Sequence, residues 1–185
     1  TGSIAFGAQP GGKKARAGGW GYILGDEGSG YAIGLAALRA VTRAADGRAA
    51  PTSLAGRILS AWDLPDAPAL IPLVYHGGLA REQIGSLAGL VADEARAGDE
   101  AALGIIRGAA QDLAAALLSV ARQLGFTGPT PCALGGGVLV HYKGLVDQVV
   151  ENCRAAGVAP DPVSIVTDPV QGALRLAAAR LAQRA

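Results

Sequence analysis

The sequence predicts an α/β fold, and three features carry that prediction. Residues 1–25 are rich in glycine and hold two short apolar patches around a turn, which is typical of a β-hairpin. Residues 29–125 repeat their apolar side chains at helical spacing. The remaining residues alternate between strand-like and helix-like segments. At 185 residues, the chain is long enough for one domain with a real core or for two small lobes.

The hairpin is predicted to pair residues 3–8 with residues 13–18. The segment between them, QPGGKK, has the Pro-Gly chemistry of a tight turn. After GDEGS, helical spacing begins, with Ser29 as the expected N-cap and Gly47 as the stop. The apolar positions of this first helix are Tyr31, Leu35, Leu38, Val41 and Ala45.

Three further helices are predicted before residue 126. One runs from Thr52 to Trp62 and another spans residues 81–96. Between them, residues 63–80 are interrupted by proline and glycine and hold one apolar run, LIPLVYH. The longest helix is capped by Asp99 and ended by Gly125. Its apolar stripe consists of Leu103, Ile106, Ala110, Leu113, Leu117, Val120 and Leu124.

The C-terminal third is predicted to alternate strand, glycine loop, helix, strand and helix. A short apolar strand precedes the glycines of ALGGGVL, and a helix follows at residues 144–156. The next strand is expected at residues 163–166. Asp168 followed by Pro169 predicts the start of the last helix, because proline fits the first helical position.

Composition excludes several classes of protein. The net charge is +1 and no basic cluster is interleaved with aromatic residues, so no nucleic-acid partner is expected. No apolar run of about 18 residues lacks a polar interruption, so no membrane partner is expected. With no signal peptide predicted, Cys132 and Cys153 are expected to be reduced thiols of a cytoplasmic protein. His76 and His141 lack acidic or cysteine partners at ligand spacing, so no metal site is predicted.

Three glycine-containing segments have features of phosphate-binding sites. Gly7 to Lys13 fits the start of a P-loop, but Lys14 stands where a Ser or Thr must reach magnesium, which favours a hairpin turn. Gly135 to Gly137 lie between a strand and a helix, where a nucleotide can approach bare backbone. Taken alone, three such glycines are more typical of a turn. Thr1-Gly2-Ser3 offers hydroxyl and N–H groups that suit a phosphate.

The loop AGGWGYILGDEGSGY combines glycines, aromatic rings and an adjacent pair of carboxylates. A rigidly held Asp26 could accept hydrogen bonds from two neighbouring hydroxyls of a sugar, with Trp20 as a wall of the pocket. The structural alternative makes Asp26 and Ser29 helix caps and Trp20 a core residue. The residues alone leave both interpretations open.

Together these segments resemble the N-acetylglucosamine and glucosamine kinases, members of the actin–hexokinase superfamily of ATP-dependent proteins. The specific part of the resemblance is GGWGYILGDEGSGY. That family has G-T-G-S on a hairpin before this block and L-G-G-G-V-L after it. IGSLAGLVADEARAGDEAA resembles its intervening helical segment, and Pro169 to Ala177 resembles its closing helix. The resemblance runs from residue 1 to about residue 182.

The resemblance implies a fold and a set of binding residues. The fold would be the C-terminal, ribonuclease-H-like lobe of an actin-like ATPase, a mixed sheet flanked by helices, with the helical segment 29–125 embedded in residues 1–185. Thr1 and Gly2 would contact the outer phosphates of ATP. Gly135, Gly136 and Gly137 would form the adenosine motif, and Ala92 would line the adenine pocket. The sugar would be bound by Gly19, Trp20, Gly21 and Asp26, and Glu27 is a candidate partner for a sugar ammonium group.

The implied activity is phosphoryl transfer from ATP, with Mg²⁺, to the 6-hydroxyl of glucosamine or N-acetylglucosamine. In such kinases the first phosphate motif and the catalytic base lie in an N-terminal lobe. The chain has no Met and begins at Thr1, so we expect a piece of a longer protein that is inactive alone. Its expected partners are the amino sugar, that N-terminal lobe and a second copy in a homodimer.

Two other functions remain open at this point. The first is an ATPase that activates a radical dehydratase or a benzoyl-CoA reductase and bridges an iron–sulfur cluster with paired cysteines. Cys132 and Cys153 lack the expected glycine-flanked context for that role. The second is a sugar-sensing or oligomerisation domain that has kept the fold without the chemistry.

Overall fold

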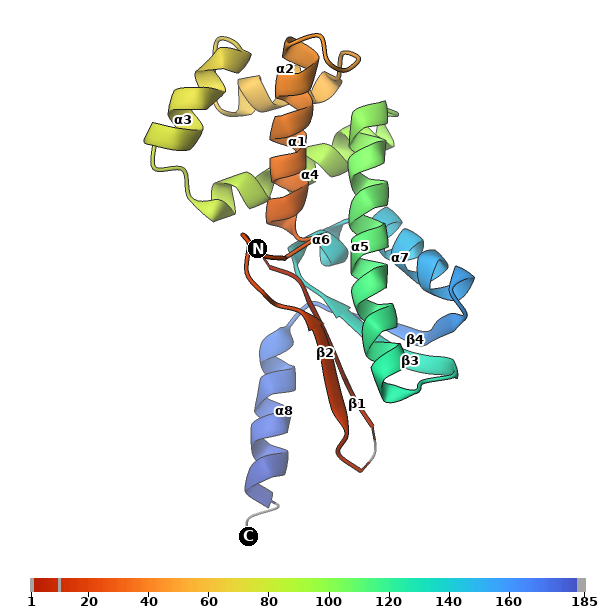
Figure 1. Cartoon of the computed structure of the whole chain (residues 1–185). Coiled ribbons are helices and arrows are strands. Elements are labelled where there is room, and N and C mark those ends of the chain that lie inside the picture. The colour runs from red at the N-terminus through yellow and green to blue at the C-terminus, as the bar shows by residue number, and fades with distance from the viewer. Residues whose placement is uncertain (1, 10, 183–185) are drawn as a thin grey trace.

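The computed structural model describes residues 2–9 and 11–182. A β-hairpin, a helical region and a parallel strand pair with its own helices follow one another along the chain. Figure 1 shows the helical region at one end of the molecule and the two strand pairs below it. The long helix α5 runs from the helical region down beside the strands.

The hairpin consists of β1 (Ile4–Ala8) and β2 (Lys14–Gly18), paired antiparallel with Phe6 opposite Arg16. One face is buried against α5 (Glu100–Leu124) through Ala5 and Ala15. Gly7 permits this contact, because a Cβ there would lie 2.6 Å from a Val120 methyl carbon. The other face leaves Phe6 exposed.

The helical region contains α1 (Gly30–Ala45), α2 (Ser53–Ala61), a short 3₁₀ helix η1 (Ala67–Ala69), α3 (Leu70–His76) and α4 (Arg81–Arg96), followed by α5. Ser29 caps α1 by accepting a hydrogen bond from the N–H of Ala32 at 3.2 Å. Helix α1 crosses α4 closely, since a Cβ on Gly34 would overlap the carbonyl oxygen of Ile84. The core of this region is formed by fully buried Ile33, Val41, Leu54, Ile58, Val91 and Ile106.

Asp99 joins three helices. Its carboxylate accepts the N–H of Ala102 and so caps α5, and it also accepts the N–H of Ser53 at 2.8 Å and the hydroxyls of Thr52 and Ser53. Ser53 also donates to Glu94 on α4. The start of α2, the end of α4 and the start of α5 are therefore held at one point.

Helix α5 is long and apolar enough, by length and composition alone, to cross a bilayer. In the structure it packs against α1, α4, α7 (Lys143–Ala155) and both hairpin strands, as the core helix of a folded domain does. It ends where predicted, with Gly125 in the left-handed conformation at φ 69°.

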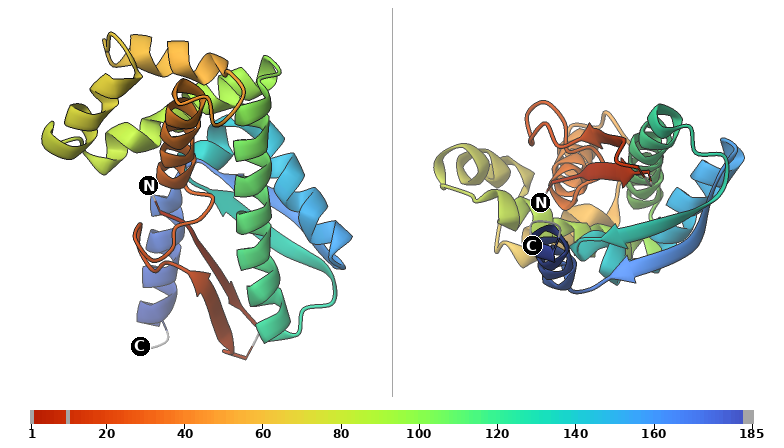
Figure 2. Two further views of the ribbon diagram at one scale, coloured as in Figure 1. Left: turned by 45° about the horizontal axis from the view of Figure 1, so that its top comes forward. Right: turned by 90° about the horizontal axis from the view of Figure 1, so that it is seen from below.

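The parallel pair consists of β3 (Gly128–Gly135) and β4 (Val158–Val166). The short helix α6 (Gly137–His141) and α7 connect these strands, and α7 buries Val146, Val149 and Val150. The last helix, α8 (Pro169–Ala182), lies beside the hairpin and away from the helical region (Figure 1). Figure 2 shows that the hairpin and the parallel pair are separate sheets, and within the described residues each has two strands.

The predicted α/β fold, with antiparallel and parallel strands flanked by helices, is confirmed. The predicted helix starts at Ser29, Asp99 and Asp168 are also confirmed, the last by an Asp168 carboxylate that accepts the N–H of Val170. Helix α3 was not predicted, and β4 begins five residues before the predicted strand. Both differences involve segments that contain proline.

Candidate functional site

A cavity of about 610 Å³ lies where β1, α1, α4 and the β3–α6 turn meet. Its volume falls in the range of small-molecule sites. Five residues predicted to bind ATP line it: Gly2, Ala92, Gly135, Gly136 and Gly137. The sixth, Thr1, lies outside the described residues. The fold thus brings three distant segments of the sequence to one cavity.

The β3–α6 turn exposes its backbone to this cavity. Gly136 has φ 104° and ψ 150°, a conformation that is essentially restricted to glycine. A Cβ on Gly136 or Gly137 would have no atom within 4 Å, so the space beside both residues is open. The turn can therefore accommodate a ligand directly against the main chain, as the sequence predicts for a nucleotide.

The opposite wall is the N-terminus of α1. Gly28 has φ 73°, and a Cβ there would lie 2.5 Å from Leu113 Cγ, so only glycine fits between this loop and α5. Ser29 is buried and lines the cavity together with Gly28 and Gly30. The N–H groups at the start of a 16-residue helix provide a partial positive charge at this end of the cavity.

Asp26 connects the loop AGGWGYILGDEGSGY to the start of β1. Asp26 is buried, with 8% of the residue exposed, and its Oδ1 accepts the N–H of Ser3 at 3.2 Å. The Ser3 hydroxyl donates to the carbonyl oxygen of Glu27 at 2.7 Å. The Asp26 carboxylate also faces Gly2, where a Cβ would lie 3.1 Å from Oδ2. The predicted sugar-binding carboxylate is thus beside the predicted phosphate-binding residue.

Asp26 is not a cap of α1, because its carboxylate bonds to β1 and the capping residue is Ser29. The backbone of Asp26 has φ 63°, which is uncommon for a residue with a side chain. Such strain is maintained by the surrounding contacts and is concentrated at functional sites. Of the two interpretations of Asp26, the structure therefore excludes the helix cap.

The predicted sugar-binding residues do not line the 610 Å³ cavity; Asp26 reaches it only through its neighbours Gly2 and Ser3, which do. Trp20 is 64% exposed, so the alternative of a core residue is wrong, and the Arg16 guanidinium lies 5.4 Å from its ring centroid. Gly19 and Gly21 flank it in left-handed conformations. Glu27 is exposed. These residues form the outer surface of the loop rather than a closed pocket.

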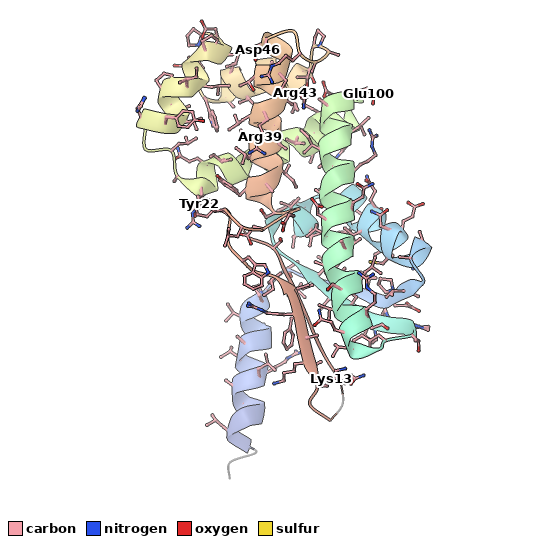
Figure 3. The ribbon with its side chains drawn as sticks, viewed as in Figure 1. Lys13, Tyr22, Arg39, Arg43, Asp46 and Glu100 are labelled. Atoms are coloured by element: carbon pink, nitrogen blue, oxygen red, sulfur yellow. The ribbon has the colours of Figure 1, made fainter. Side chains whose placement is uncertain are left out.

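The same surface carries an aromatic pair. Tyr22 meets Tyr31 edge to face at 5.4 Å, and the Arg81 guanidinium lies 4.8 Å from the Tyr22 ring centroid. In Figure 3 Tyr22 lies beside the base of α1, whereas Lys13 marks the far end of the hairpin. The loop is therefore anchored to the helical region as well as to β1.

The sequence alone did not indicate two features near these segments: Asp112 on α5, and a cluster of Asp93, Arg96 and Tyr142. Partial burial and the nearby Glu27 carboxylate raise the pKa of Asp112 on α5. Asp93, Arg96 and Tyr142 line the 610 Å³ cavity. The Asp93 and Arg96 signal was available in principle, because positions 85, 89, 92, 93 and 96 share a face of one helix.

Cys132 and Cys153 do not line the 610 Å³ cavity. Both line a second, mainly apolar cavity of about 840 Å³ between β1, α5 and β3. Burial raises the pKa of the Cys132 thiol, and burial together with Cys132 raises the pKa of Cys153 to about 11. Cys153 is fully buried and Cys132 is half-buried within this chain, so their position does not support a cluster shared across a dimer. Among the described residues no group of three or more His, Cys, Asp or Glu side chains could hold a metal ion.

A family model for the BadF/BadG/BcrA/BcrD ATPase family matches residues 1–177. The chain belongs to this ATPase family. An N-acetylmuramic acid/N-acetylglucosamine kinase from Clostridium acetobutylicum is 36% identical over 149 residues, which are 80% of this chain and 49% of that protein. An N-acetyl-D-glucosamine kinase from Dictyostelium discoideum is 32% identical, over 96% of this chain and 56% of that protein. The chain therefore spans about half the length of these relatives.

Two solved structures share the fold of this family member. A proposed N-acetylglucosamine kinase from Chromobacterium violaceum superposes with a TM-score of 0.66 at 33% identity, covering 86% of this chain and 52% of that one. A protein of the same description from Porphyromonas gingivalis gives a TM-score of 0.63 at 22% identity, with 87% and 51% covered. The predicted ribonuclease-H-like, actin-like ATPase fold is thus confirmed.

Proposed function

We propose that this chain is the C-terminal half of an ATP-dependent amino-sugar kinase. The substrate would be N-acetylglucosamine or glucosamine, phosphorylated at its 6-hydroxyl in the cytoplasm. The observation that carries the proposal is the position of Asp26. Its buried carboxylate lies beside Gly2, at the edge of a cavity lined by the glycines predicted to bind ATP.

In this proposal the chain binds and orients both substrates. The β3–α6 glycine turn and Ala92 hold the adenosine, and the phosphates lie toward Gly2 and the N-terminus of α1. Asp26 accepts hydrogen bonds from sugar hydroxyls, which fixes the ring next to the terminal phosphate. The sugar 6-oxygen then forms a bond to the terminal phosphorus as the bond to the ADP oxygen breaks, and the hydroxyl proton passes to a base.

That base and the first phosphate motif would belong to an N-terminal lobe, and without it the chain would be inactive. The relatives support this division, because this chain matches only about half of each. Mg²⁺ would neutralise charge on the ATP phosphates, which are its main ligands in such reactions. The described side chains supply no cluster of three or more acidic, His or Cys groups for it.

The test compares Asp26→Asn with the matched control Asp46→Asn in the full protein that contains these residues. Asp46 is an exposed carboxylate paired with Arg48 at the end of α1, remote from the cavity. We expect Asp26→Asn to weaken sugar binding at least about tenfold in isothermal titration, since hydrogen bonds to a charged acceptor are strong. ATP binding and the folded state should be retained, and Asp46→Asn should match the wild type.

Unchanged sugar affinity in Asp26→Asn would contradict the proposal, as would absence of sugar phosphate after incubation of the wild type with ATP and either sugar. Comparing kcat/KM for glucosamine and N-acetylglucosamine identifies the preferred substrate. If sugar binds without turnover in the wild-type protein, the sugar-sensing alternative is supported instead.

A further inference from the structure

One face of α4 forms the floor of the 610 Å³ cavity along most of the helix. Gly85, Ser86, Gly89, Ala92, Asp93 and Arg96 line it in succession. Arg96 lies eleven positions after Gly85, which corresponds to roughly 16 Å along a helix. The cavity is therefore elongated, and its two ends can differ in chemistry.

The Gly85 end adjoins the N-terminus of α1. A Cβ on Gly30 would lie 3.2 Å from the carbonyl oxygen of Gly85, so the two helices nearly touch there. Ser29 and the start of β1 line this end as well. Helix N–H groups and a serine hydroxyl suit an anion, and the apolar side chains at this end are the aliphatic Ile4, Leu113 and Val138.

The Arg96 end differs, because it presents a flat cationic group above an aromatic ring. The Arg96 guanidinium lies 5.2 Å from the ring centroid of Tyr142, and it forms an ion pair with Asp93 one turn earlier. Tyr142 is buried, and all three residues line the cavity. Among the described residues that line it, Arg96 is the only arginine or lysine.

We infer that Arg96 stacks on the purine base of the nucleotide and that Tyr142 and Asp93 hold it in position for that contact. This inference rests on the proposed function, since it assigns one contact of the proposed ATP. A guanidinium group is planar and stacks on rings, while its hydrogen bonds lie in its plane. The guanidinium carbon lies 5.2 Å from the Tyr142 ring centroid, and one of its terminal nitrogens pairs with Asp93. The Arg96 side chain remains 54% exposed, so the guanidinium keeps surface that is available to a ligand.

A phosphate contact is the competing role for Arg96. Phosphate binding at this end would place the base at the α1 end, against helix N–H groups and a buried serine. In the stacked role, the phosphates lie at the α1 end, among N–H groups, and the base lies at the Arg96 end, against a planar cation. It also explains why a cation is held over a buried tyrosine at the mouth of a nucleotide cavity.

The experiment measures binding of ATP, adenosine and inorganic tripolyphosphate to the full protein by isothermal titration. The variants are Arg96→Ala, Arg96→Lys and the control Arg48→Ala, which removes an exposed arginine also paired with a neighbouring aspartate. Arg96→Ala should weaken ATP and adenosine about tenfold and leave tripolyphosphate unchanged, the size expected for one partly desolvated stack. Arg96→Lys should recover little, because an ammonium has no planar face.

Three results would overturn the inference. Unchanged ATP affinity in Arg96→Ala would make Asp93–Arg96 a surface ion pair only. An equal loss for tripolyphosphate, or full recovery in Arg96→Lys, would make Arg96 a phosphate contact. If the wild-type protein binds neither ATP nor adenosine, both the inference and the proposed function fail. Either of the first two results would overturn only the role of Arg96 and leave the kinase proposal intact.

Discussion

Replacing Asp99 should destabilise the helical region, because this single carboxylate caps α5 and also accepts hydrogen bonds from the start of α2. In the structure it caps α5 through the Ala102 N–H at 2.9 Å and accepts the Ser53 N–H at 2.8 Å. It also accepts the hydroxyls of Thr52 and Ser53. Asp99→Ala would remove every one of these bonds, whereas Asp99→Asn would keep the side-chain shape and one acceptor oxygen.

The expected size follows from those bonds. Loss of an N-cap costs about 1 kcal/mol. A hydrogen bond to a charged group contributes about 1.5–3 kcal/mol, but water replaces much of this where the donors are exposed, as at the start of α2. We therefore expect Asp99→Ala to lower the free energy of unfolding by about 2–4 kcal/mol. Asparagine caps a helix about as well as aspartate, so Asp99→Asn should cost about 1 kcal/mol.

The charge makes this contribution dependent on pH. Partial burial acts to raise the pKa of Asp99, but hydrogen bonds from Ala102, Ser53 and Thr52 outweigh it, so the pKa lies below its ordinary value of 3.8. A folded-state pKa below the unfolded value means that the stabilisation is complete above the unfolded pKa. It is lost as the pH falls from there through the folded pKa. Asp99→Asn should therefore differ from the wild type at neutral pH and converge with it in acid.

The assay is urea unfolding followed by far-ultraviolet circular dichroism at neutral pH and at several values below pH 5. Thr42→Val is a suitable control, because the Thr42 hydroxyl donates only to a carbonyl of its own helix at an exposed position. The reasoning fails if Asp99→Ala unfolds at the wild-type urea concentration. It also fails if the difference between wild type and Asp99→Asn grows as the pH falls.

Two further predictions concern glycine. Gly34→Ala should destabilise the protein by about 2–3 kcal/mol in urea unfolding, because the new Cβ overlaps the Ile84 carbonyl oxygen. Gly56→Ala on α2 has open space and should stabilise by about 0.5–1 kcal/mol, so equal effects would disprove the close α1–α4 contact. Gly136→Ala should weaken ATP binding several-fold more than Gly137→Ala, because only Gly136 requires a positive φ. Titration with equal losses in both would show that the turn tolerates a side chain.

Local signals in the sequence were sufficient for the helix ends. Ser29 and Asp99 bond to main-chain N–H groups as their side chains allow, and Gly125 takes the left-handed conformation that terminates a helix. Such signals act over a few residues, so no tertiary information is needed. The hairpin was predictable for the same reason, since its turn lies between the strands that it joins.

Proline explains where the prediction was wrong. Pro72 indicated an interruption, but it lies in the first turn of α3, where a missing N–H leaves no hydrogen bond unmade. The second strand of the pair was predicted at residues 163–166, whereas β4 begins at Val158 and contains Pro160 and Pro162. Within the described residues, β4 pairs with β3 alone, and a strand with one unpaired side can contain proline. In both cases the outcome depended on position within an element, which composition does not reveal.

The site was predictable in part because binding by backbone leaves glycines in the sequence, while binding by side chains leaves little local trace. Gly135 to Gly137 could be identified from their place between a strand and a helix. Arg96 and Tyr142 are 46 residues apart and meet only because α4 and the β3–α6 segment pack together. The Asp26–Ser3 hydrogen bond likewise depends on how the hairpin lies against the loop.

Binding by backbone and binding by side chains contribute differently to the specificity of the site. The glycine backbone that lines part of the cavity suits the phosphates common to all nucleoside triphosphates, so these contacts discriminate poorly between bases. Discrimination must then come from the few side chains held rigidly at its ends. Arg96 is held by Tyr142 and Asp93, and Asp26 is held by Ser3, so each is fixed by a neighbour before any ligand arrives. Substitution of those supporting residues should therefore reduce selectivity for the base or the sugar more than it reduces affinity for tripolyphosphate.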